Sequence, residues 1–321
     1  MHHPSNTPVP GARTPGRSAF GFPWARLTLA ALGLLLLLLG RPDALATELP
    51  YDRGLLWKIE GAGAAPSYVL GTMHSSDPAV LDLPGPVKQA FAETRSMTTE
   101  MVIDAAVQQR MAAAMVLTNG RTLDQILGPE RFAALARIAA TYGFQPAQIQ
   151  RLKPWAAMTI ISLAPSEFAR SKQGHKPLDE ALQRAAEQRG RPIHGLETVD
   201  EQLAVFDDVP EAEQVALLDV ALREHPNIEH WFTQMRNAYL ARDTGALYRM
   251  MTAQAAGTDP ALIAAFEDRL IDDRNHRMVE RMRPLLTAGG AFIAVGALHL
   301  PGQAGVLSLL AQDGWRVSHV Y

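Results

Sequence analysis

The stretch Ala291-Phe-Ile-Ala-Val-Gly296-Ala-Leu-His299-Leu-Pro-Gly302 decides how the rest of the sequence is interpreted. Its first five residues are apolar and uncharged, and glycines bound the run on both sides, which indicates a buried strand. The strand leads into a Gly-x-x-His motif, whose glycine permits a sharp turn out of the sheet. His299 is therefore expected at the edge of the sheet, where open α/β sheets place their ligand sites.

The same pattern occurs near the other end of the chain. Ser67-Tyr-Val-Leu70 leads into a second Gly-x-x-His motif, Gly71-Thr-Met-His74. Two strands with matching motifs predict a single site to which both ends of the sequence contribute. Neutral imidazole is the commonest metal ligand, so His74 and His299 are candidate ligands. The alternative for each is a loop histidine that only ties down a strand end through a hydrogen bond.

The first 46 residues are typical of a secretory signal peptide. A region with three arginines precedes a leucine-rich, uncharged run from Leu27 to Leu39, and Ala44-Leu45-Ala46 is a small-x-small cleavage site. The run is short for a helix that spans a membrane. The sequence therefore predicts cleavage after Ala46 and a periplasmic or secreted protein. The alternative is an uncleaved anchor in the inner membrane.

Composition limits what the remaining chain, residues 47–321, can be. It has no cysteine, which excludes disulfides and thiol chemistry. The net charge of the full chain of 321 residues is −3, and no long run of lysine or arginine occurs. A nucleic-acid partner is therefore not expected, and membrane contact is expected only through an uncleaved signal peptide.

The order of strands and helices predicts an α/β fold. It has a mixed central β-sheet flanked by helices, and a large helical insertion at about 104–189 lies between the N- and C-terminal strands. Apolar runs on either side of a Gly/Pro turn indicate an opening hairpin. The predicted strands are 55–59, 67–70, 96–103, 191–196, 291–295 and 316–321. Residues 47–321 are expected to form one domain.

Two glutamates are placed near the predicted site by these strands. Alternation along the 96–103 strand puts Glu100 on the face opposite Met101. Since this strand is expected to be central, an unpaired carboxylate there would be costly. Glu197 ends the return strand at 191–196, also at a sheet edge. The alternatives are a solvent-facing Glu100, and a Glu197 that serves only as a first-turn acid favoured by the helix dipole.

Arg274 falls on an apolar stripe of its predicted helix. Ile271, Met278 and Met282 occupy the same face. A guanidinium on a core face needs a carboxylate or a bound anion, unless the side chain extends past its neighbours to solvent. Asn275 adds an amide donor beside it. If Arg274 binds a substrate oxygen, Arg274→Met should remove turnover, and relief of desolvation should stabilise the helix face.

These residues resemble the TraB/GumN family, to which the Tiki metalloproteases are related. The resemblance implies a mixed sheet flanked by helices. It also implies that both Gly-x-x-His motifs, one glutamate and one arginine cluster in a single site. Because Tiki relatives are divalent-metal proteases, it implies a divalent metal as well. The matching segments are Leu56-Trp-Lys-Ile59, Gly71-Thr-Met-His74, Glu100, Gly195-Leu-Glu-Thr198, Arg274-Asn275 and Gly296-Ala-Leu-His299-Leu-Pro-Gly302.

The leading hypothesis is an exported metal-dependent hydrolase, most similar to a peptidase. His74, His299 and a glutamate would hold manganese, cobalt or zinc, a second carboxylate would take a proton, and Arg274 would stabilise an oxyanion. Either Glu100 or Glu197 can be the ligand, and the other is then the base. The substrate would be a peptide or another small or polymeric envelope component. The alternative is a non-catalytic envelope protein that binds a metal, haem or an anionic ligand at the same place. His-Glu-x-x-His and Gly-x-Ser-x-Gly motifs are absent from the sequence.

Overall fold

The computed structural model describes residues 49–61, 64–252 and 259–321. The predicted signal peptide at residues 1–46 lies outside these described residues. No helix within them is both long and apolar enough to cross a membrane.

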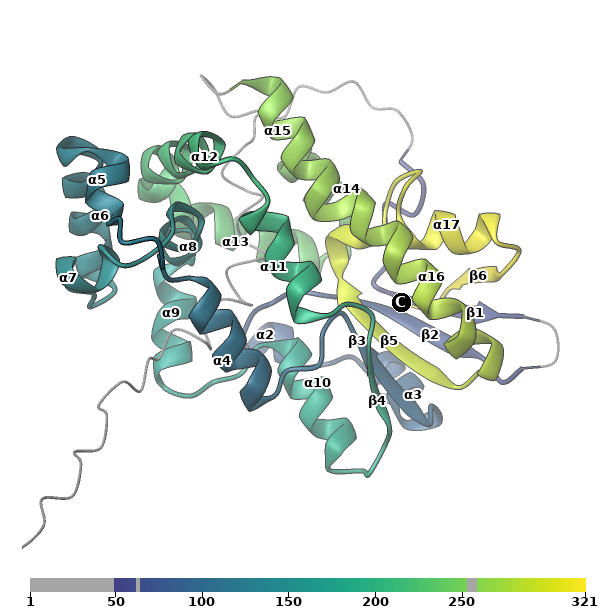
Figure 1. Cartoon of the computed structure of the whole chain (residues 1–321). Coiled ribbons are helices and arrows are strands. Elements are labelled where there is room, and N and C mark those ends of the chain that lie inside the picture. Colours follow the sequence, from purple (N-terminus) through teal and green to yellow (C-terminus); the bar gives the residue numbers. More distant parts are fainter. Residues whose placement is uncertain (1–48, 62–63, 253–258) are drawn as a thin grey trace, which may run out of the picture.

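The predicted mixed sheet is confirmed, and its six strands lie in the order β4-β3-β5-β2-β1-β6 (Figure 1). The pairs β2–β5, β5–β3 and β3–β4 are parallel, whereas β1 pairs antiparallel with both β2 and β6. Four neighbouring strands therefore run in the same direction and end at the same edge. The strands are β1 (Leu56–Glu60), β2 (Ser67–Thr72), β3 (Ser96–Thr99), β4 (Ile193–Gly195), β5 (Ala291–Gly296) and β6 (Arg316–His319).

Most of the described chain is helical. The first half holds α2 (Pro78–Leu81), α3 (Gly85–Glu93), α4 (Ala105–Ala114), α5 (Leu123–Leu127), α6 (Pro129–Thr141), α7 (Pro146–Ile149), α8 (Pro154–Ile161), α9 (Pro165–Lys172) and α10 (Leu178–Glu187). The second half holds α11 (Val199–Asp207), α12 (Glu211–Glu224), η3 (His225–Asn227), α13 (Ile228–Leu240), α14 (Thr244–Thr252), α15 (Pro260–Glu267), η4 (Asp268–Asp272), α16 (Asp273–Ala288), η5 (Ala297–His299) and α17 (Val306–Gln312).

The central strand β5 contributes to two separate apolar cores. Ile293 and Val295 pack with Met278 and Met282 of α16 on one face, while Phe292 belongs to the core on the other face. Phe292 meets Phe91 of α3 edge to face, with 5.1 Å between the ring centroids. Successive side chains of β5 point to opposite faces of the sheet, and both faces are buried. This explains why residues 291–295 carry no polar side chain.

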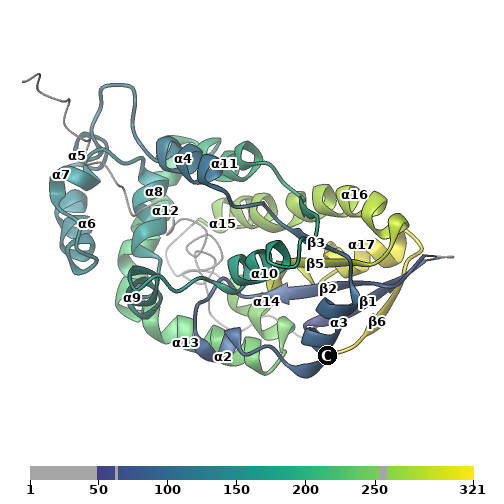
Figure 2. The same cartoon turned by 90° about the horizontal axis from the view of Figure 1, so that it is seen from below.

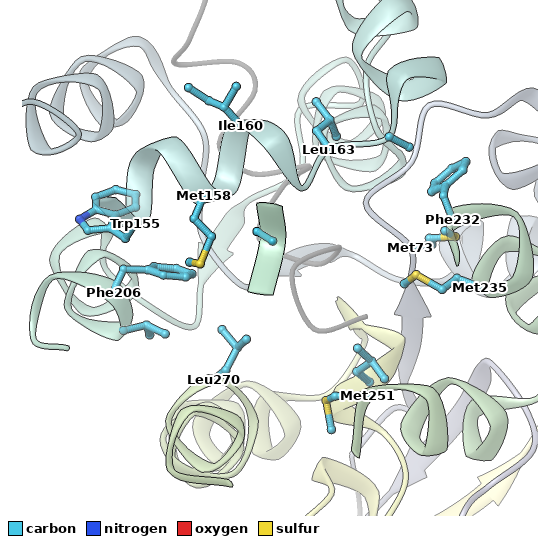
Figure 3. Packing of buried hydrophobic residues seen from close by; sticks show 14 of the residues in the cluster. Met73, Trp155, Met158, Ile160, Leu163, Phe206, Phe232, Met235, Met251 and Leu270 are labelled. Carbon is cyan, nitrogen blue, oxygen red and sulfur yellow. The ribbon is translucent and has the colours of Figure 1, made fainter. Parts of the chain in front are cut away.

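The helical cap lies beyond the edge of the sheet at which β2, β3 and β5 end (Figures 1 and 2). It comprises α4–α9 and α11–α13. Figure 3 shows its apolar interior, where Trp155 of α8 stacks on Phe206 of α11 at 5.4 Å between centroids. The cap is therefore placed where it covers the carboxyl ends of the parallel strands.

A buried carboxylate ties the cap to the loop that follows β2. Glu167 of α9 accepts hydrogen bonds from Ser75 Oγ at 2.5 Å and from the backbone amide of Ser76 at 3.0 Å. Ser76 Oγ also donates to Glu167, at 2.8 Å, and Arg170 forms an ion pair with Glu167 at 2.6 Å. Because the loop begins directly after His74, these bonds fix the position of that histidine relative to the cap.

The prediction of a strand at 96–103 was wrong beyond Thr99. The neighbouring strands β5 and β4 end at Gly296 and Gly195, so the ladder partners are lost after Glu100. The backbone amide and carbonyl of Ile103 bond instead to the side chain of Gln183 on α10, each at 3.0 Å. Glu100 consequently lies just past a strand end rather than within a strand.

Helix α10 does not belong to the cap, although it lies within the predicted helical insertion at about 104–189. It packs against β3 and β4 and covers the sheet itself. The helical path from α15 to α16 is continuous through a π-helical turn, η4. Such turns often occur next to functional residues, and Arg274 follows this one.

Candidate functional site

The four parallel strands each deliver one of the predicted site residues. His74 follows the end of β2, Glu100 follows β3, Glu197 follows β4 and His299 follows β5. Because these strands share one direction, the four side chains are brought to one edge of the sheet. Arg274, the fifth predicted residue, comes from the first turn of α16 and meets both glutamates there.

Arg274 is buried and its guanidinium joins the two glutamates. Its Nη2 donates to Glu100 Oε2 at 2.7 Å and to Glu197 Oε2 at 2.6 Å. Its Nε donates to both oxygens of Glu197 at 3.1 and 3.0 Å, and Nη1 donates to the carbonyl of Leu270 at 3.1 Å. The side chains of Arg274 and Glu100 are 9% exposed and that of Glu197 is 0% exposed, so the ion pairs are shielded from water.

The two glutamates differ in what else they contact. Glu197 accepts further hydrogen bonds from Arg277 at 3.2 Å and from Gln202 at 3.3 Å, which leaves its oxygens fully engaged. Glu100 Oε1 instead accepts a hydrogen bond from the backbone amide of Gly296 at 2.6 Å and lies 3.7 Å from His299 Nε2. Glu100 therefore faces the histidines, whereas Glu197 lies behind Arg274.

His299 is held by an amide. Asn275 Nδ2 donates to the carbonyl of Ala304 at 2.9 Å, so its Oδ1 is turned toward the ring and accepts from His299 Nδ1 at 2.7 Å. This contact places the proton of a neutral ring on Nδ1 and leaves the lone pair on Nε2, the atom nearer Glu100.

His74 is held by a carboxylate that the sequence did not single out. Its Nδ1 lies 2.6 Å from Asp179 Oδ2, in the first turn of α10. Thr72 Oγ1 donates to the other oxygen of Asp179 at 2.5 Å. Asp179 and Thr72 are therefore functional candidates in their own right. A first-turn acid is expected at many helix N-termini, so the sequence offered no signal that separated Asp179 from those.

The charges of the site stabilise one another. Burial alone would lower the pKa of His74, but the carboxylate of Asp179 outweighs burial and raises that pKa to about 9. Burial, together with the cation of Arg274, lowers the pKa of His299 to about 3, so this ring is neutral. Burial alone would raise the pKa of Glu100, yet the cation of Arg274, the protonated ring of His74 and the backbone amide of Gly296 hold it well below its usual range.

The glycines of the two motifs are explained by close packing between them. A Cβ on Gly71 would lie 2.6 Å from Leu300 Cδ1 and 3.1 Å from the Cα of Ala297. A Cβ on Gly296 would lie 3.3 Å from Glu100 Oε1. Each glycine thus makes room for a residue of the site or of the other motif.

We expect Gly71→Ala to lower the free energy of unfolding by about 1–3 kcal/mol, because the added methyl group overpacks the contact with Ala297 and Leu300. The matched control is Gly85→Ala in the first turn of α3, where nothing lies within 4 Å of the added Cβ. Urea denaturation of both variants measures the difference. Equal stability of Gly71→Ala and Gly85→Ala would contradict the packing of the two motifs.

The donor chemistry of the site fits a divalent cation. Both histidines engage Nδ1 with an oxygen, and no described residue lies within hydrogen-bond distance of either Nε2, which is the arrangement found in metal-ligating histidines. Glu100 supplies an ionised carboxylate beside them. Within residues 49–61, 64–252 and 259–321, however, no three acidic or histidine side chains are grouped closely enough to hold a metal ion.

The described residues thus form an α/β protein with two histidines and two glutamates at the ends of parallel strands, joined by a buried arginine. The model of the TraB/PrgY/gumN family matches residues 55–319. The chain therefore belongs to this family, which confirms the resemblance of its motifs.

The chain is similar to two kinds of relative. Metalloprotease TIKI2 of Danio rerio is 24% identical over 303 residues, and metalloprotease TIKI1 of Danio rerio is 23% identical over 330 residues. The matches cover 79% and 87% of this chain but only 58% and 66% of those relatives. The uncharacterized protein YbaP of Shigella flexneri is 24% identical, over 76% of this chain and 87% of YbaP. No solved structure matches the chain.

Proposed function

We propose that the protein is a metal-dependent hydrolase that acts on peptides. The observation that carries the proposal is the pair of histidines whose Nδ1 atoms are fixed by Asp179 and Asn275, with Glu100 beside the Nε2 atom of His299. The peptide class of substrate is supported by the relatives that are named metalloproteases. His74, His299 and Glu100 would hold the ion, which is manganese, cobalt or zinc in our proposal.

A divalent ion bound there would polarise a carbonyl oxygen and lower the pKa of bound water. The chain's own residues prepare the site. Arg274 keeps Glu100 ionised and fixes its orientation, because it donates to Glu100 while it is locked against Glu197. The neutral ring of His299 offers a lone pair without a proton to displace. Binding at His74 must release the proton that Asp179 stabilises.

Arg274 was predicted to stabilise an oxyanion. Its Nε and Nη2 protons are directed at the two glutamates in the structure, so only Nη1 retains a donor for a substrate. We therefore propose that Arg274 acts mainly as a positioning residue for Glu100. Export to the periplasm or beyond remains part of the proposal and rests on the sequence of residues 1–46.

Two amide substitutions separate the roles of the glutamates. Glu100→Gln is expected to weaken zinc affinity, because it replaces an anionic ligand by a neutral one. Glu197→Gln should keep zinc bound but lower turnover by about ten- to a thousandfold, because Glu100 and Arg274 lose their alignment. Turnover of a peptide library is measured with manganese, cobalt or zinc added in turn, beside zinc titration of each variant.

Metal binding without turnover of any peptide would favour the non-catalytic binding protein over the peptidase. The opposite pattern, weak zinc binding in Glu197→Gln and intact binding in Glu100→Gln, would exchange the two assignments. Unchanged affinity and turnover in both variants would remove the carboxylates from the mechanism.

A further inference from the structure

We propose that Asp179, supported by Thr72, is a positioning residue that sets which ring nitrogen of His74 faces the site. The contact itself is independent of any metal, but its consequence for metal affinity rests on the function proposed above. Asp179 lies on α10, a helix that packs against the sheet, and reaches His74 across more than one hundred residues of sequence. Nothing in the Gly-x-x-His motifs includes it.

The geometry around Asp179 leaves little freedom. Its Oδ2 is 2.6 Å from His74 Nδ1, and its Oδ1 is 2.5 Å from Thr72 Oγ1, so each oxygen has its own partner. The side chains of His74 and Asp179 are only 15% and 13% exposed, which strengthens the charge-assisted contact. Asp179 is therefore fixed from the end of β2, two residues before the histidine that it holds.

The backbone around this contact is also fixed. The amide of Leu178, next to Asp179, donates to the carbonyl of Ser75, next to His74, at 3.1 Å. Tyr239 of α13 donates to the carbonyl of Gly71 at 3.1 Å. The loop that carries His74 is thus held by α10 and α13. A substitution at Asp179 should therefore change the hydrogen bonding of the His74 ring without moving the backbone of the loop.

A carboxylate can only accept, so Asp179 requires His74 Nδ1 to carry a proton. The lone pair of the neutral ring then lies on Nε2. Asn275 imposes the same tautomer on His299 by a different device, because its Nδ2 is committed to Ala304 and only its oxygen faces the ring. Both histidines therefore present the same nitrogen, although one is held by a charge and the other by an amide.

The test is Asp179→Leu in the full chain, which fills the place of the carboxylate with a side chain that has no hydrogen-bond acceptor. An amide would be a poor test, because Thr72 Oγ1 can donate to the carbonyl of Val295 and accept from an asparagine, whose oxygen could then still face His74. In Asp179→Leu nothing holds the ring proton on Nδ1, and a neutral ring with its proton on Nε2 has no lone pair there for a ligand. We expect zinc affinity to fall by about 10- to 100-fold, the usual effect of losing an outer partner of a ligating histidine.

The tautomer is read directly by ¹⁵N NMR of the protein labelled at histidine, without metal and at a pH at which the His74 signals no longer change and are those of the neutral ring. The His74→Ala spectrum assigns its signals. The matched control is Asp77→Leu, since Asp77 is another carboxylate of the same loop but pairs with Arg236 at 2.9 Å and caps α2. This control should keep the tautomer and zinc affinity of the wild type.

An Nδ1–H tautomer of His74 that is as dominant in Asp179→Leu as in the wild type would overturn the inference, whatever the zinc result. A switched tautomer in a protein that never binds zinc would support the positioning role and refute the metal site instead. If Asp179→Leu does not fold, Thr72→Val replaces it. That variant leaves Asp179 with one partner and should weaken zinc binding by about tenfold, and an unchanged affinity in it would also overturn the inference.

Discussion

Arg274→Met is expected to lower the free energy of unfolding by about 3–5 kcal/mol, because it leaves two buried carboxylates without their cation. Glu197 is fully buried and Glu100 nearly so. The sequence alone suggested that removing a buried charge would relieve desolvation and stabilise this helix face. That expectation left out the cost of two carboxylates, Glu100 and Glu197, which remain in the core when the guanidinium is removed.

The measurement is urea denaturation in the presence of a chelator, so that bound metal does not contribute. The matched control is Arg283→Met on the same helix, where the guanidinium is 54% exposed and pairs with Asp313. A surface pair contributes about 1 kcal/mol or less, so this control should remain near the wild type. Adding Glu100→Gln and Glu197→Gln to Arg274→Met should recover much of the loss. A loss no greater than that of Arg283→Met would contradict the buried ion pair.

His74→Ala and His299→Ala are each expected to lower zinc affinity by more than about a hundredfold. Loss of an outer partner of a ligand already costs about 10- to 100-fold, and loss of the ligand itself must cost more. Neither variant should unfold, because Asp179 keeps its bond from Thr72, and Asn275 keeps its bond to Ala304.

Isothermal titration with zinc and elemental analysis after dialysis measure the loss. His230→Ala is the control, because His230 is exposed on α13 and contacts Gln234 rather than the site. Zinc content equal to that of the wild type in both site variants would show that the metal binds elsewhere.

The sequence was sufficient to predict that the candidate residues gather at the ends of neighbouring strands. The runs before Gly71 and Gly296 carry the uncharged pattern of strands buried on both faces. The parallel pairing of β2 with β5 became visible only in the structure. The inward orientation of Arg274 was also predicted, because the phase of a helix is visible in the spacing of Ile271, Met278 and Met282.

Contacts between distant segments were not predictable in this way. Asp179 touches His74 only because α10 lies on the sheet beside β3, and no local pattern encodes that placement. The end of β3 was missed for a similar reason. Residues 100–103, which follow it, have strand-like composition. The neighbouring strands β4 and β5 end at Gly195 and Gly296, so residues beyond Glu100 have no strand to pair with.

The most direct test of the account is anomalous diffraction from crystals of the protein grown with zinc. The account predicts one strong anomalous peak within about 2.0–2.2 Å of Nε2 of His74, Nε2 of His299 and an oxygen of Glu100. It also predicts that both Nδ1 atoms keep their contacts with Asp179 and Asn275. A fully occupied zinc bound away from these two histidines, or a zinc bound through Nδ1 of either ring, would contradict it.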